Sequence, residues 1–397
     1  MNPIAKTLRP LASAAIFYYT TLWLVSLVVV GTIAQKYFGL QASLEKYFSA
    51  WFIQPMEMPI WLPSGRFTMA LILVNLTAKM LFSTKWKWKM AGINITHLGV
   101  MILMIGGVMT AYTTIEGNLA IQEGKSSSVF KDFHQLELAV TDHSDPEFDH
   151  VTTFSEGFFT EGNTFSDSKV PFTFKVQKHH KNCEPVERTQ GKQSPRLKQH
   201  ATRYQFEALP PDKQDQNAGG IEVEITGVPA EAEGIYLFYF DPRRGGIATT
   251  IQGNDGKDYS IQLRPRQYEL PFSVHLKDFE KLDHAGTMMA RAYSSKVTVT
   301  DGDSKDDIKI YMNHPLRRHG YTLYQASFIQ PNQSGIETSV FQVVYNKGRY
   351  MPYIAIAVIT LGLLVHLCIQ IPKLLSASAQ KPTIGPKEPT KPTEHSI

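Results

Sequence analysis

The apolar residues of this chain are concentrated in four blocks, at residues 14–34, 67–83, 91–112 and 351–371. Each block is close to the roughly 17–25 residues that a helix needs to cross the hydrocarbon core of a bilayer. Only a structure that bonds its own backbone polar groups is stable there, so the pattern predicts four transmembrane helices. The second block is the shortest and contains Lys79, whose long side chain can reach the headgroups.

Residues 113–350, between the third and fourth blocks, have a different pattern. Short runs alternate or are rich in β-branched and aromatic residues, and Gly, Pro, Asp and Asn clusters separate them; examples are GIEVEITG, GIYLFYF, SKVTVTD and TSVFQVVY. This pattern predicts a β sandwich or barrel. Residues 178–219 are polar, basic and poor in β-branched residues, and are predicted to form a partly mobile surface excursion.

The predicted fold class is therefore a polytopic α-helical membrane protein with four transmembrane helices and a large, mainly β extracytoplasmic domain. The domains are an N-terminal membrane region at 1–112, the β domain at 113–350, the fourth helix at 351–371 and a disordered cytoplasmic tail at 372–397. The first block is predicted to be an uncut anchor. It is rich in tyrosine and tryptophan and lacks a clear small-x-small cleavage site.

The positions of lysine and arginine predict the orientation. With four spans, both termini and the loop at 84–90 lie on one side, and these segments contain Lys6, Arg9, the run TKWKWK and the lysines of the tail. Cytoplasmic segments are enriched in such residues, so both termini are predicted to be cytoplasmic. In the first outer loop, Trp51 and Trp61 stand where an interfacial segment would carry them.

Composition narrows the possible chemistry. The 397 residues have a net charge of +4, which gives no reason to propose nucleic acid as a partner. The two cysteines are Cys183, in the outer domain, and Cys368, in the fourth span, so the topology prevents them from pairing within one chain. The absence of C-x-x-C-H from the sequence excludes covalent c-type haem, and the absence of C-x-x-C disfavours thiol–disulfide exchange. No phosphate-binding loop, nucleophile elbow or H-E-x-x-H is present.

Thirteen histidines remain as possible ligands. Ten lie in the β domain with spacings that form no recognisable metal site, and His179 and His180 among them are predicted to be solvated. His97 and His366 differ, because they are the only histidines in predicted spans. A polar side chain at membrane depth usually faces protein, water or a cofactor.

Depth suggests a role for His97 and His366. At about 1.5 Å per residue, His97 lies roughly 9 Å and His366 roughly 7–8 Å from the cytoplasmic ends of their spans. Two imidazoles at one level could ligate a b-type haem. Alternatively, each could donate a hydrogen bond to a carbonyl of a neighbouring helix. Met101 and Met104, one and two turns after His97, could offer a thioether, but we expect them to be core packing residues.

Several landmarks, in order along most of the chain, carry a family resemblance. They are GTIAQ at the end of the first span, GRFTMALILVNLTAKML in the second, THLGVMILMIGG in the third, and ELPFSVHLKDFEK, SSKVTVTDG and DIKIYMNHPLRRHGYTLYQASF in the β domain. With them the chain resembles the ResB (CcsB) family of cytochrome c biogenesis, the System II pathway. The run Asn313-His314-Pro315-Leu316, followed by Gly320-Tyr321 and Tyr324-Gln325-Ala326-Ser327, is the most specific of these landmarks.

The resemblance implies a function. Proteins of this family pair with a multi-span CcsA (ResC) subunit in the bacterial inner membrane, with the large domain in the periplasm. The complex moves haem across the membrane and attaches it to the C-x-x-C-H thiols of apocytochrome c. The family's third-span histidine, an axial ligand of the inner haem site, matches His97. The partner supplies its counterpart, which weakens the case for His366.

The sequence departs from the family around the last span. An acidic residue with Pro-Gly is common before that span and an arginine-rich aromatic stretch after it, whereas this chain reads VYNKGRYMPY and HLCIQIPKLL. Three hypotheses are therefore kept open. The chain is a haem-handling subunit of a synthetase complex and not catalytic alone, or a scaffold or apocytochrome chaperone without haem, or a b-type haem electron carrier.

Overall fold

The computed structural model describes residues 9–54, 59–83, 87–188, 194–209, 217–286, 290–329 and 336–379. The chain divides into two compact units. One contains residues 1–23, 68–111 and 348–397, and the other contains residues 24–67 and 112–347. Of the predicted tail, residues 380–397 lie outside the described residues.

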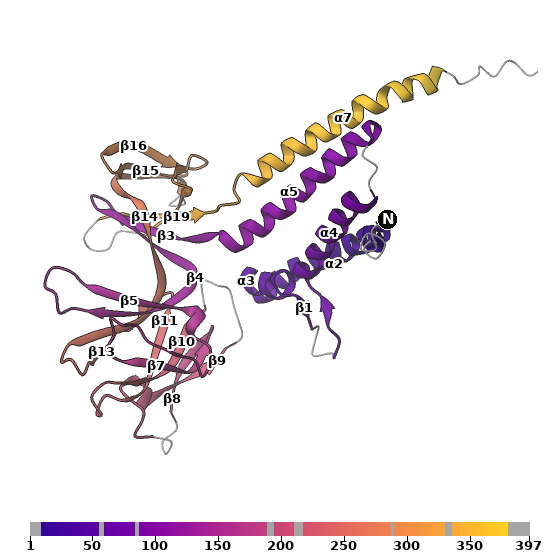
Figure 1. Ribbon diagram of the computed structural model, residues 1–397. Coiled ribbons are helices and arrows are strands. Elements are labelled where there is room, and N and C mark those ends of the chain that lie inside the picture. Colours follow the sequence, from indigo (N-terminus) through magenta and orange to yellow (C-terminus); the bar gives the residue numbers. More distant parts are fainter. Residues whose placement is uncertain are drawn as a thin grey trace, which may run out of the picture. The chain divides into compact units, whose positions relative to one another are not determined.

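The four predicted membrane helices are present, each long and apolar enough to span a bilayer. They are α2 (Ala14–Phe38), α4 (Gly65–Ala78) with the π-helical turn η3 (Lys79–Ser83), α5 (Ala91–Thr113) and α7 (Met351–Ala379). The short helical elements η1, α3, η2 and η4 span Arg9–Ala12, Leu40–Leu44, Glu45–Ser49 and Trp88–Met90. Helices and a mainly β region between α5 and α7 confirm the predicted fold class (Figure 1).

The fourth helix is longer than predicted. It continues past residue 371, through Pro372, to Ala379, where the sequence predicted a disordered tail. A proline inside a helix removes one backbone donor and clashes with the preceding turn. The residues after Pro372 are KLLSASA, in which lysine, leucine and alanine are good helix formers. The helix propensity of these residues accounts for the extra turns of α7 after Pro372.

Small residues bring α5 and α7 into close contact along their length (Figure 1). Gly92, Gly99 and Gly106 are spaced by seven residues on α5 and are all buried. A Cβ on Gly92 would lie 2.5 Å from Cα of His366, and one on Gly99 would lie 2.6 Å from Cγ1 of Ile359. Because seven residues are nearly two helical turns, the three glycines form one stripe against α7.

The surface that faces this stripe, formed by α7 and by Gly348 just before it, has glycines and alanine at the same spacing. Gly348, Ala355 and Gly362 are also seven residues apart, and Ala355 is fully buried. A Cβ on Gly362 would lie 2.5 Å from the amide nitrogen of Thr96, and one on Gly348 would lie 2.6 Å from Oγ1 of Thr110. Small residues at such contacts let helix backbones approach closely, which drives association where lipid removes the hydrophobic effect.

The segment between α2 and α4 is folded around Phe48. A Cβ on Gly31 of α2 would lie 2.6 Å from Cε2 of Phe48, and one on Gly65 of α4 would lie 3.0 Å from its Cδ1. The buried Ser64 hydroxyl donates to the carbonyls of Tyr47, at 3.0 Å, and Ala50, at 2.6 Å. The two landmark glycines thus accommodate one aromatic ring. A short hairpin, β1 (Phe52–Ile53) and β2 (Leu62–Pro63), completes the segment.

The β domain contains three antiparallel sheets built from seventeen strands of the described chain. The strands are β3 (Ile115–Gln122), β4 (Ser126–Asp142), β5 (His150–Ser155), β6 (Thr164–Phe165), β7 (Thr173–His180), β8 (Cys183–Glu187), β9 (Tyr204–Ala208), β10 (Gly219–Thr226), β11 (Gly234–Asp241), β12 (Gly245–Gly246), β13 (Thr249–Gln252), β14 (Asp258–Asp283), β15 (Ala290–Asp301), β16 (Ser304–Tyr311), β17 (Leu316–Arg318), β18 (Tyr321–Ile329) and β19 (Thr338–Tyr345). The short helices η5 (Glu156–Phe158) and α6 (His200–Arg203) connect them.

The largest sheet has the order β16-β15-β14-β4-β3-β19-β18-β17, with β5 on β4 and β13 on β14. A five-stranded sheet has the order β12-β11-β10-β7-β6, and β8 pairs with β9. Strand β14 is 26 residues long and runs through both halves of the domain (Figure 1). Its register with β4 shifts between Pro265 and Gln267 and again between Glu269 and Val274.

Two separate hydrophobic cores lie on either side of these register shifts. The first joins the five-stranded sheet to the start of β14 and includes Phe172, Phe174 and Ile261. The second lies within the larger sheet around the end of β14 and includes Phe130, Leu276 and Phe341. The long strands β4 and β14 contribute residues to both cores, so the domain consists of two lobes that share a sheet.

The predicted surface excursion at 178–219 is more ordered than its composition indicates. Strand β7 continues to His180, and the β8–β9 hairpin and α6 follow. Cys183 and Ala201 are buried, and Leu197 forms a small cluster with Leu237 of β11. These apolar residues are too widely spaced to form a periodic run, so only the tertiary structure brings them together. Residues 189–193 and 210–216 of the excursion lie outside the described residues.

Candidate functional site

His97 lies on α5, on the side turned away from α7. It follows Gly92 by five residues and precedes Gly99 by two, so at about 100° per residue it lies some 140–160° from the glycine stripe. The residue is half-buried, and its Nδ1 is fully covered without a hydrogen-bond partner among the described residues. Lys79, the first residue of η3, interacts electrostatically with the His97 ring.

His366 lies on α7, on the side that touches α5. It follows Gly362 by one turn, about 40° further round the helix, and its backbone nitrogen, Cα and Cβ are the atoms against Gly92. Its Nδ1 is likewise buried without a partner in the described part of the chain. The hydrogen bonds to helix carbonyls that would satisfy either Nδ1 are thus not formed.

The two histidines do not face each other across the α5–α7 contact. His366 is level with Gly92, whereas Thr96, next to His97, is level with Gly362. Five residues separate Gly92 from His97, a displacement of about 7.5 Å along the axis. The sequence predicted equal depth from the ends of the spans, but the stagger of the helices offsets the two rings. This offset disfavours one haem held between the two rings, and the pairing of His97 with His366 stays a prediction.

The His97 face of α5 fits the edge of a haem site. Met101 and Met104 lie on it, one and two turns later, and both are half-buried, whereas Val108, a turn further, is exposed. The covered Nδ1 tests the fit, because protein blocks that nitrogen and a haem iron would be held by Nε2, which is not among the buried atoms of the described chain that lack a partner. His97 therefore fits as one axial ligand. Its assignment, like that of His366, stays a prediction.

The β-domain landmarks have structural roles. The hydroxyl of Ser295 on β15 bonds Oε1 of Gln325 on β18 at 2.7 Å and the hydroxyl of Ser339 on β19 at 2.9 Å. Ser295 and Ser339 are fully buried. Because β15 and β18 are not neighbours in the sheet, these bonds link strands that face each other within the second lobe.

The NHPLRRHGY landmark, residues 313–321, connects β16 to β18 and contains the short strand β17 between two turns. Asn313, His319 and Gly320 have φ of 65°, 49° and 89°, a region that favours glycine and that asparagine tolerates. His319 Nε2 lies 2.7 Å from Asp301, and Arg318 forms an ion pair with Asp306. The contacts of Asp306 with Arg318 and of Asp301 with His319 thus stabilise a backbone whose positive φ values are unfavourable. This part of the most specific landmark thus has a structural role, because it forms the two turns on either side of β17.

Two ionisable pairs in the β domain are partly or fully buried. Arg264 Nε donates to Glu137 at 2.9 Å, and the side chain of Glu137 is 4% exposed. His179 Nε2 lies 3.6 Å from Glu156. Burial lowers the pKa of His179 to about 4 and raises the pKa of Glu156, so His179 is uncharged at neutral pH.

The prediction that His179 and His180 are solvated is wrong. Both are half-buried in β7, and Nε2 of His180 has no partner in the described chain. Their neighbours in space, the ring of Phe159 for His179 and the ring of Phe206 for His180, are distant in sequence. The KHHK run by itself therefore gives no indication of this packing.

Cys183 is a packing residue. It is 1% exposed, and its sulfur lies where a Cβ on Gly220 would come within 2.6 Å. Burial raises the pKa of its thiol to about 12, so the nucleophilic thiolate is scarce at neutral pH. Cys368 on α7 is exposed, and both cysteines are free, as the topology predicted.

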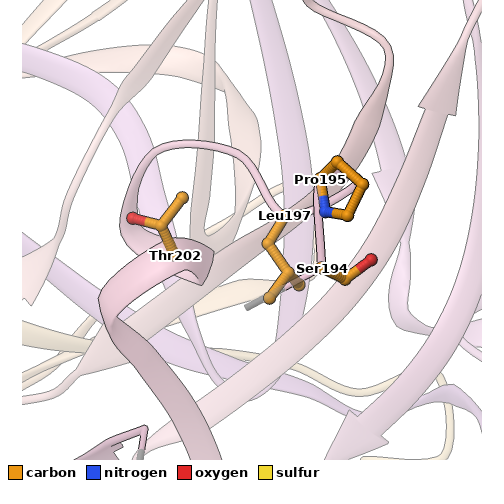
Figure 2. Close-up of a pocket in the computed structure, with 4 residues that line it drawn as sticks. All are labelled: Ser194, Pro195, Leu197 and Thr202. Carbon is orange, nitrogen blue, oxygen red and sulfur yellow. The ribbon is translucent and has the colours of Figure 1, made fainter. Parts of the chain in front are cut away.

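One hollow in the β domain has a volume of about 320 Å³ and is lined by Ser194, Pro195, Leu197 and Thr202 (Figure 2). Among the described residues that line the hollow, none has a charged side chain. Within the described ranges, no group of three or more histidine, cysteine, aspartate or glutamate side chains could hold a metal ion.

Comparisons with known proteins support the resemblance of the sequence. Residues 245–340 match the model of the ResB-like family, a segment that contains most of the second core. The chain is also 30% identical over 115 residues to protein NrfI of Wolinella succinogenes. The aligned part is 28% of this chain and 12% of NrfI, so the chain spans only a small fraction of that relative's length.

Proposed function

We propose, from the match of residues 245–340 to the model of the ResB-like family, that the chain is a membrane subunit of a cytochrome c maturation system. In this function it acts with a CcsA/ResC-type subunit in the bacterial inner membrane. The complex exports or handles haem and supports its attachment to the C-x-x-C-H thiols of apocytochrome c. Both termini are cytoplasmic and the β domain is periplasmic.

The orientation of His97 is the observation that carries the haem part of the proposal. Its ring is turned away from α7, and its Nδ1 has no hydrogen-bond partner in the described chain. The bound haem supplies the iron and the vinyl groups, and this chain supplies one imidazole. His366 lies on the other side of the contact, so the second ligand comes from the CcsA/ResC-type subunit. The chain itself contributes positioning and no general acid or base.

An absorbance spectrum tests this function. The full chain is purified alone and with its co-expressed partner subunit, and each preparation is examined for a Soret band. We expect the band only in the complex, and we expect His97→Ala to abolish it. His366→Ala is the matched control, because it removes the other membrane histidine and should leave the Soret band in place.

A second candidate, a scaffold or apocytochrome chaperone without haem, is favoured by one observation. The polar landmark residues of the β domain bond to one another and hold the fold. If the complex has the same spectrum after both histidines are replaced, the scaffold is correct and haem ligation by this chain is wrong. The third candidate, an electron carrier, requires a redox-active Soret band in the isolated chain.

A further inference from the structure

The segment between α2 and α4 and the ends of α2 and α5 present aromatic side chains to the surroundings. Trp51 is 51% exposed, Trp61 is 66% exposed and Tyr37 is 68% exposed. Tyr112, the penultimate residue of α5, is 71% exposed. Tryptophan and tyrosine are enriched where a membrane protein meets the headgroup layer, because one end of each ring is apolar and the other polar.

Three cations lie over the rings of this region. Lys36 Nζ is 5.8 Å from the centre of the Tyr37 ring, and Lys46 Nζ is 5.7 Å from the centres of the Phe38 and Tyr47 rings. The guanidinium of Arg66 is 5.9 Å from the Trp51 ring and 5.8 Å from the Tyr112 ring. Such contacts hold a cation in place and leave its charge uncompensated.

No carboxylate forms an ion pair with these cations within the described chain. The ion pairs of the described residues include none with Lys36, Lys46 or Arg66, and the nearby Glu45 pairs with Lys181, at 3.4 Å. The cations therefore give a positive charge to the ends of α2 and α4 and to the segment between them. We call this region the Lys36–Arg66 surface and define it by Lys36, Lys46, Arg66, Trp51 and Tyr112. A diffuse anionic layer is its electrostatic complement.

Chain topology brings this surface to the membrane boundary. The ring of Phe48 is held between Gly31, inside α2, and Gly65, at the start of α4. Gly31 lies seven residues before the end of α2, so the ring of Phe48 is about 10 Å below that end. The residues around Phe48 are thus fixed beside the ends of two spans.

We propose that the Lys36–Arg66 surface binds the phosphate headgroups of anionic phospholipids in the adjacent leaflet, with the rings of Trp51 and Trp61 in the interfacial layer. The cations contact the lipid phosphates, and the rings lie beside the glycerol region. The binding is a membrane contact of this chain and does not depend on haem or on the partner subunit. Its failure and the failure of the proposed function are therefore separable.

Lipid binding is measured on the full chain in nanodiscs of phosphatidylcholine mixed with phosphatidylglycerol, by the enrichment of phosphatidylglycerol around the protein. The test variant is Lys36→Gln/Lys46→Gln/Arg66→Gln. Each lost charge should lower the enrichment about fivefold, the effect of one basic residue near an anionic surface. The matched control, Lys125→Gln/Lys169→Gln/Arg317→Gln, removes the same charge from exposed positions of the β domain and should leave it unchanged. The charge-conserving variant Lys36→Arg/Lys46→Arg should also keep the enrichment of phosphatidylglycerol.

Fluorescence gives a second measurement that does not require the triple variant to fold. With Trp23, Trp86 and Trp88 replaced by phenylalanine, only Trp51 and Trp61 remain. Phospholipids brominated near the headgroup end of the acyl chain should quench both residues, and aqueous iodide should not. Strong quenching by iodide would overturn the proposal, as would protection from both quenchers, which would mean that protein covers the surface. Equal enrichment in the test and control variants would also overturn it.

Discussion

The α5–α7 pair and the β domain are stabilised in opposite ways. Between α5 and α7 the contacts are made where side chains are absent, at Gly92, Gly99 and Gly362. In the β domain the contacts are made by the largest side chains, with Phe174 and Phe341 both fully buried. The hydrophobic effect drives the packing of the β domain. Between helices in lipid this effect is absent, because lipid is as apolar as leucine, and close van der Waals packing stabilises the contact instead. Enlarging a residue should therefore harm the first region, and shrinking one should harm the second.

The largest effect is expected from Gly92→Leu. The new Cβ would meet the backbone of His366, which cannot rotate away, so we expect α5 and α7 to separate at a loss of more than about 4 kcal/mol. Crosslinking of cysteines placed on the two helices, in a Cys368→Ser background, measures their association.

Gly107→Leu is the matched control for Gly92→Leu. It makes the same change on the same helix, but a Cβ on Gly107 meets nothing within 4 Å. Crosslinking in this variant should equal that of the parent. If both variants crosslink alike, the glycine stripe does not hold the helices together.

A smaller effect is expected from Phe174→Ala in the first core of the β domain. Removing a fully buried phenylalanine leaves a cavity, and the expected loss in free energy of unfolding is about 3–5 kcal/mol. Pulse proteolysis of the full chain in urea measures it. Phe148→Ala, at a phenylalanine that is 67% exposed, should change the stability by less than about 0.5 kcal/mol. Equal losses at the two positions would contradict the assignment of the core.

The smallest effect is a pH dependence in the second lobe. Glu280 accepts hydrogen bonds from Lys296 and Lys309, each at 2.9 Å, and from Ser294 at 3.0 Å. These hydrogen bonds lower the pKa of the Glu280 carboxyl from 4.5 to about 2, and the bond from Lys296 has the largest effect. The folded state thus favours the ionised form, and the stabilisation is complete above pH 4.5 and disappears as the pH falls towards 2.

Glu280→Gln should therefore reduce the stability of the full chain at neutral pH and flatten its decline in this acidic range. The measurement is urea unfolding at several pH values. Glu147→Gln is the control, because Glu147 is exposed and forms no ion pair among the described residues. If Glu280→Gln and the parent decline in parallel between pH 4.5 and 2, the carboxylate does not carry the effect.

Much of the fold could be predicted from local patterns, but the relation between His97 and His366 could not. Counting residues from the ends of the two spans gave equal depth. The observed offset depends on which residues of α5 and α7 meet, and Gly92 meets His366 instead of a residue at the level of His97. The facing directions of the rings also follow from the glycine stripe, whose spacing of seven residues is visible in the sequence and would have revealed them.

By itself, the sequence determined the four membrane helices, the β domain between the third and fourth of them, and the family resemblance. These follow from hydrophobic runs, from alternation and from short ordered landmarks, all of which act over neighbouring residues. Only the tertiary structure decided the stagger of α5 against α7, the burial of His179 and Cys183, and the division of the β domain into two cores. Those features depend on contacts between residues far apart in the chain, where close packing in three dimensions selects the partners.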